Sequence, residues 1–194
     1  MNQTSDSKMR CPWCLGFPQY VDYHDQEWGV PVHDDRVHFE FLILESAQAG
    51  LSWATVLKKR EGYRRAFADF DYQIVAEFPD SYVEELLQDS SIIRNGAKIR
   101  AAINNARRFM EVQEEFGSFS KYIWSFVGGK PIQNALRAGE AYPATSPESD
   151  ALAKDLKKRG FKFLGSTVMY AHMQATGLVN DHLVECFRYQ EVKI

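Results

Sequence analysis

The sequence has few cysteines and no long apolar run, and each absence excludes a class of protein. Three cysteines among 194 residues cannot form a disulfide framework, and an odd count favours reduced thiols. No apolar stretch is long enough to cross a membrane. Residues 1–10 lack the apolar core of a signal peptide. We therefore expect a cytoplasmic protein without membrane contact, and a monomer is the default assembly.

An excess of positive charge is also missing. The net charge is −3 and the isoelectric point is about 6.0, whereas proteins that bind nucleic acids are usually more basic. Any contact with phosphates must therefore come from a local patch. The hydrophobic fraction of 45% is ordinary for a globular protein, and the length fits one large domain or a domain with an annex.

Repeats and sustained strand alternation are absent, and the pattern that remains is helical. Apolar residues between 98 and 110 recur at helical spacing, with the arginines on the opposite face. Residues 127–147 are rich in turn formers, which predicts a connection between a central helical body and a returning C-terminal segment. We therefore predict an all-α fold with helices at 34–49, 52–68, 98–110, 148–159 and 166–177.

A short helical hairpin is predicted between helices at about 80–89 and 97–110, joined by residues 90–96. The apolar pair Ile92 and Ile93 would tuck inward, while backbone N–H groups at the tip could face a DNA phosphate. Arg94 and Lys98 would add positive charge. On spacing alone, an ordinary connection between two helices of a bundle is the more frequent explanation.

One carboxylate lies in an unusual place, because Glu45 ends an apolar helix just before a small-residue turn and Trp53. Among apolar neighbours we expect Glu45 to have a raised pKa or a specific partner. The alternative is a helix-end glutamate in water. Trp13, Tyr23 and Trp28 add aromatic rings nearby, which could sandwich a planar ligand or simply fill a core.

Two possible metal half-sites stand at opposite ends of the chain: Cys11 with His24, and His182 with Cys186. Together they supply two thiolates and two imidazoles, which is a set that tetrahedral zinc prefers. The three-residue spacing between His182 and Cys186 would place both on one face of a helical turn. Four protein ligands would leave no open position, so we expect one structural zinc ion.

Cys14 leaves two alternatives open. A second ligand set would combine Cys11 and Cys14 with His182 and Cys186, and a redox-active pair of Cys11 and Cys14 is a weaker third possibility. The other histidines have no partner in the sequence and are interpreted as surface or core residues: His33, His38 and His172.

Long motifs make the chain resemble the 3-methyladenine DNA glycosylase I family from about residue 9 to about residue 187. Several of these motifs are uncommon, so chance similarity is a poor explanation. The matching stretches include Tyr23-His24-Asp25, Glu27-Trp28-Gly29-Val30-Pro31, Glu45, Gln48-Ala49-Gly50-Leu51-Ser52-Trp53, Ile92-Ile93-Arg94, Trp124-Ser125-Phe126-Val127, and residues 157–163 and 177–182.

The resemblance implies a helix-hairpin-helix glycosylase fold with a zinc site that joins the two termini. It implies that Cys11, His24, His182 and Cys186 are the ligands and that Cys14 is an extra thiol. The implied division of the single glycosylase unit, residues 1–194, is a helical body at about 30–127, which contains the hairpin at about 80–110, and a zinc-linked subdomain formed by residues 9–29 and 145–187.

The resemblance also implies an activity. The expected reaction is hydrolysis of the N-glycosidic bond of N3-methyladenine in alkylated double-stranded DNA, which releases free 3-methyladenine without lyase activity. Glu45 and Tyr23 would read the base, and Trp53 would be a stacking wall of the pocket with Trp13 close by. Glu45 is the one candidate catalytic residue, and no general base is assigned. The Gly50–Leu51 turn would press into the duplex, with Leu51 as the apolar wedge.

The hairpin departs from the pattern of the family. Ser91 stands where relatives usually carry glycine, and the stretch Asn95-Gly96-Ala97 also differs, so the phosphate contacts of the hairpin are not carried over. Two rival functions remain on the residues alone. A zinc hydrolase would need an open coordination position, and a non-catalytic DNA-binding module would need no pocket around Glu45 and Trp53.

Overall fold

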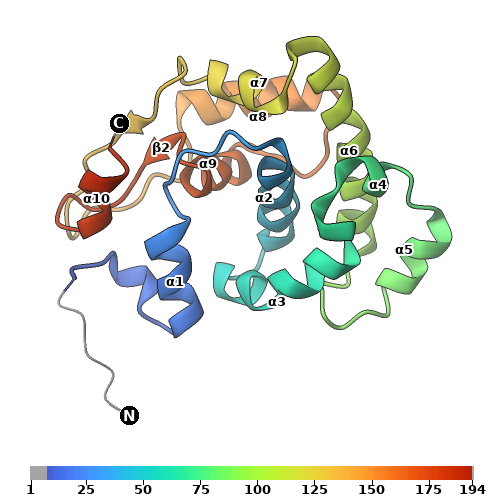
Figure 1. The fold of residues 1–194 in the computed structure, drawn as a ribbon, viewed down its shortest axis with the longest axis horizontal. Coiled ribbons are helices and arrows are strands. Elements are labelled where there is room, and N and C mark those ends of the chain that lie inside the picture. Colours follow the sequence, from blue (N-terminus) through green and yellow to red (C-terminus); the bar gives the residue numbers. More distant parts are fainter. Residues whose placement is uncertain (1–7, 194) are drawn as a thin grey trace.

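The chain folds into a bundle of helices arranged around a central helix, with α1 and α10, the first and last helices of the described residues, at one side (Figure 1). A computed structural model describes residues 8–193. The elements in chain order are η1 (Pro12–Cys14), α1 (Pro18–Gln26), α2 (Asp35–Gln48), α3 (Trp53–Ala66), η2 (Ala68–Phe70), α4 (Tyr72–Ala76), α5 (Asp80–Leu86), α6 (Gly96–Phe116), α7 (Phe119–Ser125), β1 (Ile132–Gln133), α8 (Pro147–Lys158), α9 (Ser166–Ala175), β2 (Val179–Asn180) and α10 (Phe187–Glu191).

Side-chain caps define where the main helices begin. The Asp34 carboxylate accepts hydrogen bonds from the first backbone N–H groups of α2, and the Ser52 hydroxyl accepts from Thr55 N at the start of α3. The Asn95 side chain likewise accepts a hydrogen bond from Lys98 N at the start of α6. This helix ends at Gly117, which adopts the left-handed conformation. These residues satisfy N–H groups that have no partner inside the helix, so the helices begin at polar residues and not at the first apolar one.

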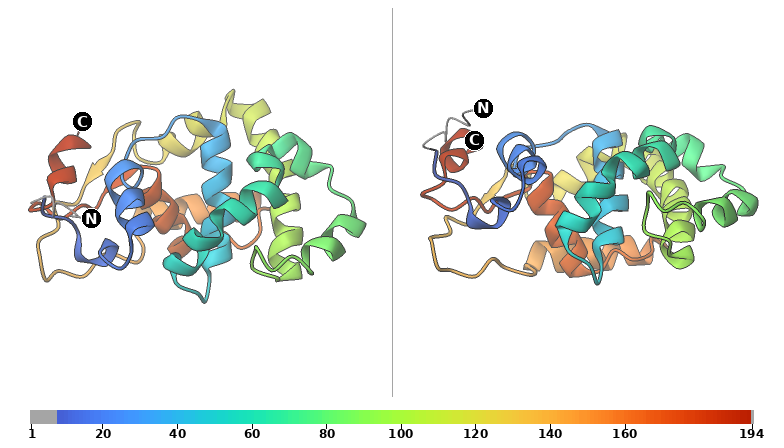
Figure 2. Two further views of the ribbon diagram at one scale, coloured as in Figure 1. Left: turned by 60° about the horizontal axis from the view of Figure 1, so that its bottom comes forward. Right: turned by 90° about the horizontal axis from the view of Figure 1, so that it is seen from below.

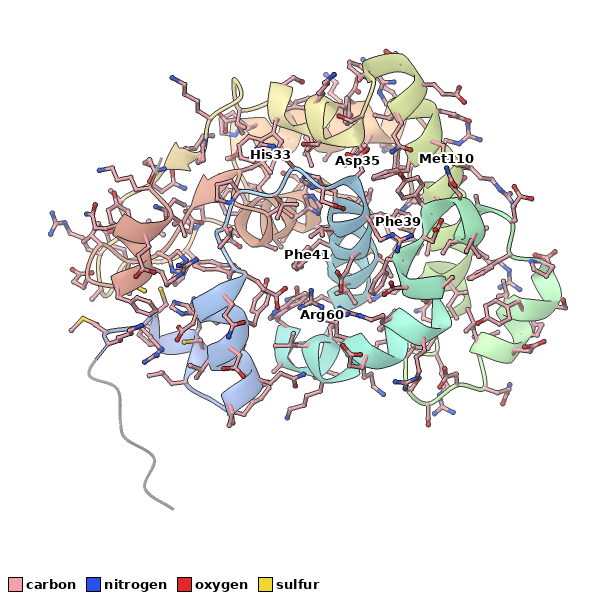
Figure 3. All side chains as sticks on the ribbon, viewed as in Figure 1. His33, Asp35, Phe39, Phe41, Arg60 and Met110 are labelled. Carbon is pink, nitrogen blue, oxygen red and sulfur yellow. The ribbon has the colours of Figure 1, made fainter. Side chains whose placement is uncertain are left out.

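The central helix α2 is buried on all sides from His38 to Ala47, which explains its nearly unbroken apolar sequence. Phe39 and Phe41 leave this helix on opposite sides (Figure 3). Phe39 joins the large core with Phe109 of α6, at a ring distance of 5.4 Å. Phe41 faces the smaller core at the end that holds both termini, where its ring lies 6.3 Å from that of Trp53.

The N-terminal segment and the C-terminal segment pack against each other (Figure 2). The N–H of Phe187 donates to the carbonyl of Met9 at 2.9 Å. A pair of two-residue parallel strands also connects the segment after α7 to the C-terminal segment, with Ile132 opposite Val179. The prediction of an all-α fold is confirmed, and these two short strands are the one exception among residues 8–193.

Several predicted helix ends differ from the structure. The helix expected at 52–68 stops at Ala66, because Ala68, Asp69 and Phe70 adopt positive φ angles and turn the chain. The hairpin helices run over Asp80–Leu86 and Gly96–Phe116, so the first is shorter and the second longer than predicted. No helix within the described part of the chain is long and apolar enough to span a bilayer. The division into a body and a zinc-linked subdomain stays a prediction.

Candidate functional site

A cavity of about 260 Å³ lies where the two cores meet. Aromatic rings form most of its wall, and Glu45, Gln48 and Gln174 supply polar groups. Its volume lies just below the range of about 300–1,000 Å³ that is usual for small-molecule sites, so it suits one small planar ligand. The aromatic wall consists of Trp13, Tyr20, Tyr23, Trp28, Trp53 and Tyr142.

The rings of this wall come from separate elements and contact one another. Trp53, the first residue of α3, lies 5.3 Å from the ring of Tyr23 on α1, with 46° between the planes. Trp13 of η1 lies 4.9 Å from Trp28 in an edge-to-face arrangement. Such contacts fix the orientations of the rings, and aromatic rings that line a cavity can bind a planar cation.

Glu45 is buried in this wall with 4% of its surface exposed. Its Oε2 atom has no hydrogen-bond partner among residues 8–193, and the indole N–H of Trp53 likewise has no acceptor there. Burial raises the pKa of the Glu45 carboxyl from 4.5 to about 8. The alternative of a helix-end glutamate in water is therefore wrong. A buried carboxyl with a free oxygen beside a cavity indicates a ligand that completes it.

Tyr23 stands beside Glu45 and is also buried. Burial and the neighbouring Glu45 charge raise the pKa of its phenol, so the group stays protonated and can donate a hydrogen bond. Near it, Arg60 of α3, which is labelled in Figure 3, reaches Glu40 of α2 at 2.7 Å and Glu27 at 2.8 Å. This charged group ties α3 to α2 and to the chain just after α1, which all supply cavity residues.

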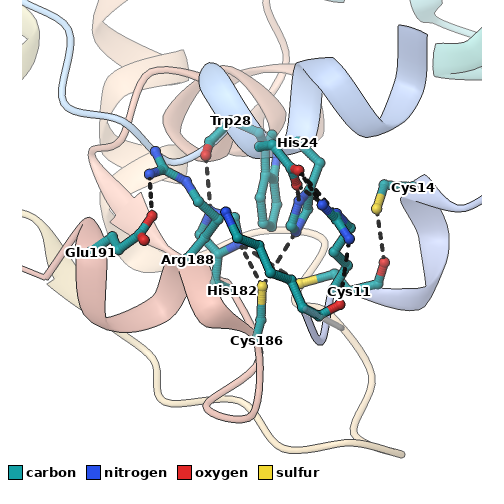
Figure 4. A network of polar contacts seen from close by, with 11 residues as sticks. Cys11, Cys14, His24, Trp28, His182, Cys186, Arg188 and Glu191 are labelled. Carbon is teal, nitrogen blue, oxygen red and sulfur yellow. Dashed lines mark hydrogen bonds and ion pairs between the residues drawn. The ribbon is translucent and has the colours of Figure 1, made fainter. Parts of the chain in front are cut away.

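The two metal half-sites meet in one cluster of side chains (Figure 4). One ligand atom from each of Cys11, His24, His182 and Cys186 lies within 4.8 Å of the others. The Cys186 sulfur is 3.5 Å from His24 Nε2 and 3.7 Å from His182 Nδ1, and the Cys11 sulfur is 3.8 Å from His182 Nδ1. Tetrahedral zinc bonds place neighbouring ligand atoms roughly 3.4–3.8 Å apart, so the spacing fits.

The outer nitrogens of both imidazoles are already engaged, as in many protein metal centres. His24 Nδ1–H donates to the Asp25 carboxylate at 2.8 Å, and Arg10 holds that carboxylate at 2.7 Å. His182 Nε2–H donates to the Trp28 carbonyl at 2.9 Å. With the outer nitrogens held in this way, His24 Nε2 and His182 Nδ1 are directed at the thiols. The donor set therefore fits zinc.

The local structure of the C-terminal half-site differs from the prediction. Residues 182–186 form a turn and not a helix, because the Asn180 side chain accepts from His182 N at 3.2 Å and Cys186 N donates to Leu183 O at 2.8 Å. Cys186 precedes α10. Cys14 lies outside the four-residue group, and its thiol donates to the Cys11 carbonyl at 3.2 Å.

The hairpin residues occupy different environments. Ile92 is buried as predicted, and the N–H of Ile93 donates to the Tyr63 hydroxyl at 3.2 Å. Arg94 is exposed at the tip. The ammonium group of Lys98 donates to two carbonyls at the end of α2, those of Ala47 at 2.9 Å and Ala49 at 2.8 Å. The expected role of Lys98 at a phosphate stays a prediction.

The Gly50–Leu51 turn follows α2 directly. Gly50 has a φ of +82°, which glycine adopts without strain, and Leu51 is 42% exposed. Because Lys98 ties the preceding carbonyls to α6, this turn is held close to the start of α6, where the hairpin ends. An exposed leucine on an anchored turn beside an aromatic cavity is suited to enter another molecule.

Sequence reasoning missed several residues of the site. Gln174 of α9 and Tyr142 of the segment between α7 and α8 line the cavity, and no motif of the sequence marks them. His38 and His172, interpreted as unpaired, form a buried pair in which His38 Nδ1 lies 3.2 Å from His172 Nε2. His33 lies on the Trp124 ring at 4.9 Å.

Comparison with known proteins agrees with these features. A family model described as methyladenine glycosylase matches residues 13–189. The chain is 49% identical to DNA-3-methyladenine glycosylase 1 of Escherichia coli K12, over 93% of this chain and 96% of that protein. It is 47% identical to DNA-3-methyladenine glycosylase of Haemophilus influenzae, over 91% of this chain and 96% of that protein.

Solved structures of the same kind match closely. A crystal structure of 3-methyladenine DNA glycosylase I has a TM-score of 0.88 and 51% identity, covering 92% of this chain and 98% of that one. A variant of such an enzyme in complex with 3-methyladenine has a TM-score of 0.89 and 36% identity, covering 92% of this chain and 96% of that one. Fold and site thus define a helical glycosylase. The chain belongs to the methyladenine glycosylase family.

Proposed function

We propose that this protein is a DNA glycosylase that hydrolyses the N-glycosidic bond of N3-methyladenine in alkylated double-stranded DNA. The products are free 3-methyladenine and an abasic site, and the reaction takes place in the cytoplasm. The observation that carries the proposal is the buried Glu45 carboxyl, which lines an aromatic cavity and has one oxygen without a partner among residues 8–193, in a chain of this family.

The chemistry of the base explains why such a cavity is sufficient. Methylation at N3 places a positive charge on the purine and weakens its bond to the sugar, so the base leaves without being protonated. The protein has to extract the base and hold it beside water. Extraction costs a few kcal/mol, and less for a damaged base. No residue needs to act as a general acid, and none of the cavity residues is assigned as a general base.

The cavity distinguishes the cationic base from neutral adenine through two effects. The faces of Trp53 and Tyr23 attract a cation through their ring electrons. A cation beside Glu45 also lowers the pKa of its carboxyl from about 8, because the negative form then gains an attractive partner. The carboxylate accepts a hydrogen bond from the exocyclic amine of the base. Neutral adenine gains neither electrostatic contribution.

Contact with the duplex is assigned to two exposed elements. The side chain of Leu51 fills the space that the extracted base leaves in the stack, and Gly50 allows the sharp turn that presents it. The hairpin at residues 90–96 lies against the phosphate backbone in the manner of a helix-hairpin-helix motif, with Arg94 contributing charge. With a net charge of −3, binding depends on these local contacts and not on overall attraction.

We also propose one structural zinc ion held by Cys11, His24, His182 and Cys186, because their spacing and their engaged outer nitrogens suit it. When bound, the ion supplies a cross-link between the two ends of the chain. Four protein ligands leave no position for water, which disfavours a zinc hydrolase. Metal analysis should find about one zinc per chain. Cys186→Ser should lose the ion, while Cys14→Ser should keep it; equal loss in both variants would reject this ligand set.

Release of free base tests the glycosylase itself. Methylated duplex DNA is incubated with the zinc-loaded protein, and the supernatant is analysed for 3-methyladenine by chromatography. We expect release by the wild type and a large loss in Glu45→Gln, whereas Glu114→Gln at an exposed position of α6 should release base normally. Binding to DNA without release of base would instead support a non-catalytic DNA-binding module.

A further inference from the structure

A second buried carboxylate lies next to the cavity. Asp181 has no exposed surface and accepts three hydrogen bonds, all from neutral donors. The Asn134 amide donates to Oδ1 at 2.6 Å, and the Tyr170 hydroxyl donates to Oδ2 at 2.9 Å. The third donor is Nε2 of Gln174, at 2.8 Å from Oδ2. Gln174 also lines the cavity, so Asp181 connects the interior to the site.

This hydrogen bond determines which way the Gln174 amide faces. A carboxylate with three donors around it can only accept, so Gln174 must direct its NH2 group toward Asp181. The carbonyl oxygen Oε1 is then directed away from Asp181. That oxygen has no hydrogen-bond partner among residues 8–193, and it is not one of the buried atoms left without a partner, so part of its surface is accessible on a residue that lines the cavity. Gln174 therefore offers the cavity an acceptor.

Glu45 alone does not provide such a fixed acceptor. Before a cation is bound, its pKa is near 8, so the carboxyl can meet an incoming base either with a proton to donate or as an acceptor. It can thus pair with an exocyclic amine or with an exocyclic carbonyl. Gln174 has no equivalent freedom, because turning its amide would bring its carbonyl against the Asp181 carboxylate at a distance where two acceptors repel.

We propose that Gln174, oriented by Asp181, is a specificity-determining residue that favours 6-amino over 6-oxo purines methylated at N3. An adenine-type base carries an amine donor at position 6, whereas a guanine-type base carries an acceptor there. The Gln174 carbonyl oxygen gains a hydrogen bond from the amine of an adenine-type base. The same oxygen is left unpaired beside the carbonyl of a guanine-type base. The inference rests on the proposed glycosylase function. Gln174 contacts the base, and Asp181 is a positioning residue.

The experiment measures both bases released from one substrate. Duplex DNA treated with a methylating agent contains N3-methyladenine and N3-methylguanine, and chromatography of the supernatant gives the two release rates. Gln174→Met keeps the length of the side chain but removes the acceptor. We expect the ratio of 3-methyladenine to 3-methylguanine release to fall about tenfold, which is the effect of one hydrogen bond.

Gln113→Met is the matched control. Its amide donates to the Asp35 carboxylate at 2.6 Å, which is the same kind of contact in a part of the fold remote from the cavity. In Gln113→Met, the ratio of 3-methyladenine to 3-methylguanine release should stay at the wild-type value, even if the variant is less stable. An unchanged ratio in Gln174→Met, or an equal fall in Gln113→Met, would overturn the inference. A wild type that releases no 3-methyladenine would instead reject the glycosylase function.

Asp181→Asn tests the orienting role separately. An amide at this position can donate, which allows Gln174 to turn and present its NH2 group to the cavity. Release of 3-methylguanine should then rise relative to 3-methyladenine, in a protein that still holds its zinc ion by metal analysis. Because Asp181 precedes a ligand, zinc content is measured in the same samples. Equal decreases of both rates with zinc retained would show a structural effect only and would contradict the orienting role.

Discussion

Replacing Glu45 with glutamine should change how stability depends on pH, and the sign follows from burial. The carboxyl has a pKa of 4.5 in the unfolded chain and about 8 in the folded protein. Between these values the folded state holds a proton that the unfolded state has lost, so the free energy of unfolding decreases as the pH rises. The stabilising contribution is complete below pH 4.5 and is lost above about pH 8. Glu45→Gln has no such titration.

The magnitude is large enough to measure. The rise in the pKa of Glu45 is equivalent to roughly 4–5 kcal/mol, at about 1.36 kcal/mol for each unit of pKa. Between about pH 5.5 and about pH 9, the stability of Glu45→Gln relative to the wild type should therefore increase by about 3 kcal/mol. The unpaired amide of the variant has its own cost, but that cost is the same at every pH.

Urea denaturation of zinc-saturated samples at several pH values provides the measurement. Titration of the other groups is shared by both proteins and cancels in the difference. Glu114→Gln on the exposed face of α6 should follow the wild type throughout. A difference between Glu45→Gln and wild type that is constant from pH 5.5 to pH 9 would refute the reasoning, because it would mean that Glu45 titrates alike in both states.

Three further substitutions test the mechanical parts of the site. Leu51→Ala should change the free energy of unfolding by less than about 0.5 kcal/mol, because the Leu51 side chain is 42% exposed. Base release from duplex DNA should nevertheless fall at least about tenfold. Normal release would exclude the role of Leu51 as a wedge. Gly62→Ala should lower the free energy of unfolding by about 1–3 kcal/mol in urea denaturation, because the new Cβ would lie 2.3 Å from the Ser91 carbonyl oxygen. This steric cost exceeds the gain of about 1 kcal/mol that alanine brings in helix propensity. Phe163→Gly should stabilise by about 1 kcal/mol, because Phe163 has a φ of +58° and is 46% exposed; a loss of stability would show that its packing outweighs the strain.

The parts of the fold that depend on local sequence were predictable. Helical periodicity and polar caps such as Asp34 and Ser52 located the starts of the long helices closely, whereas α6 continues past its predicted end at residue 110 to Phe116. The turn at residues 182–186 was not predictable from the sequence, because the spacing between His182 and Cys186 suits a turn as well as a helix. There, the hydrogen bond that the Asn180 side chain accepts from His182 N competes with the helical pattern. The two candidate ligands are therefore held by a turn and not by a helix.

The site was predictable where its residues share one short motif and unpredictable where distant segments meet. Glu45 and Trp53 lie within one turn-containing stretch, and the scarcity of thiols made Cys11 and Cys186 conspicuous. Gln174 and Tyr142 come from segments about a hundred residues away, and nothing in their neighbourhood marks them before the chain is folded. The same limit applies to the pair of His38 and His172, which lie 134 positions apart.

The proposed metal centre and the cavity are joined through neighbouring residues, so each is expected to shape the other. Trp28 accepts a hydrogen bond from His182 through its carbonyl, while its ring lines the cavity and packs against Trp13. Tyr23 of the cavity wall directly precedes His24, whose ring lies 5.3 Å from Trp13. A cavity lined by unpaired polar groups tends to collapse or fill, because each such group is costly when buried. The proposed zinc ion would oppose that collapse by fixing Trp13, Tyr23 and Trp28 through their neighbours in the metal cluster. We therefore expect zinc removal to weaken the selection of substrate, although the four ligands themselves do not line the cavity.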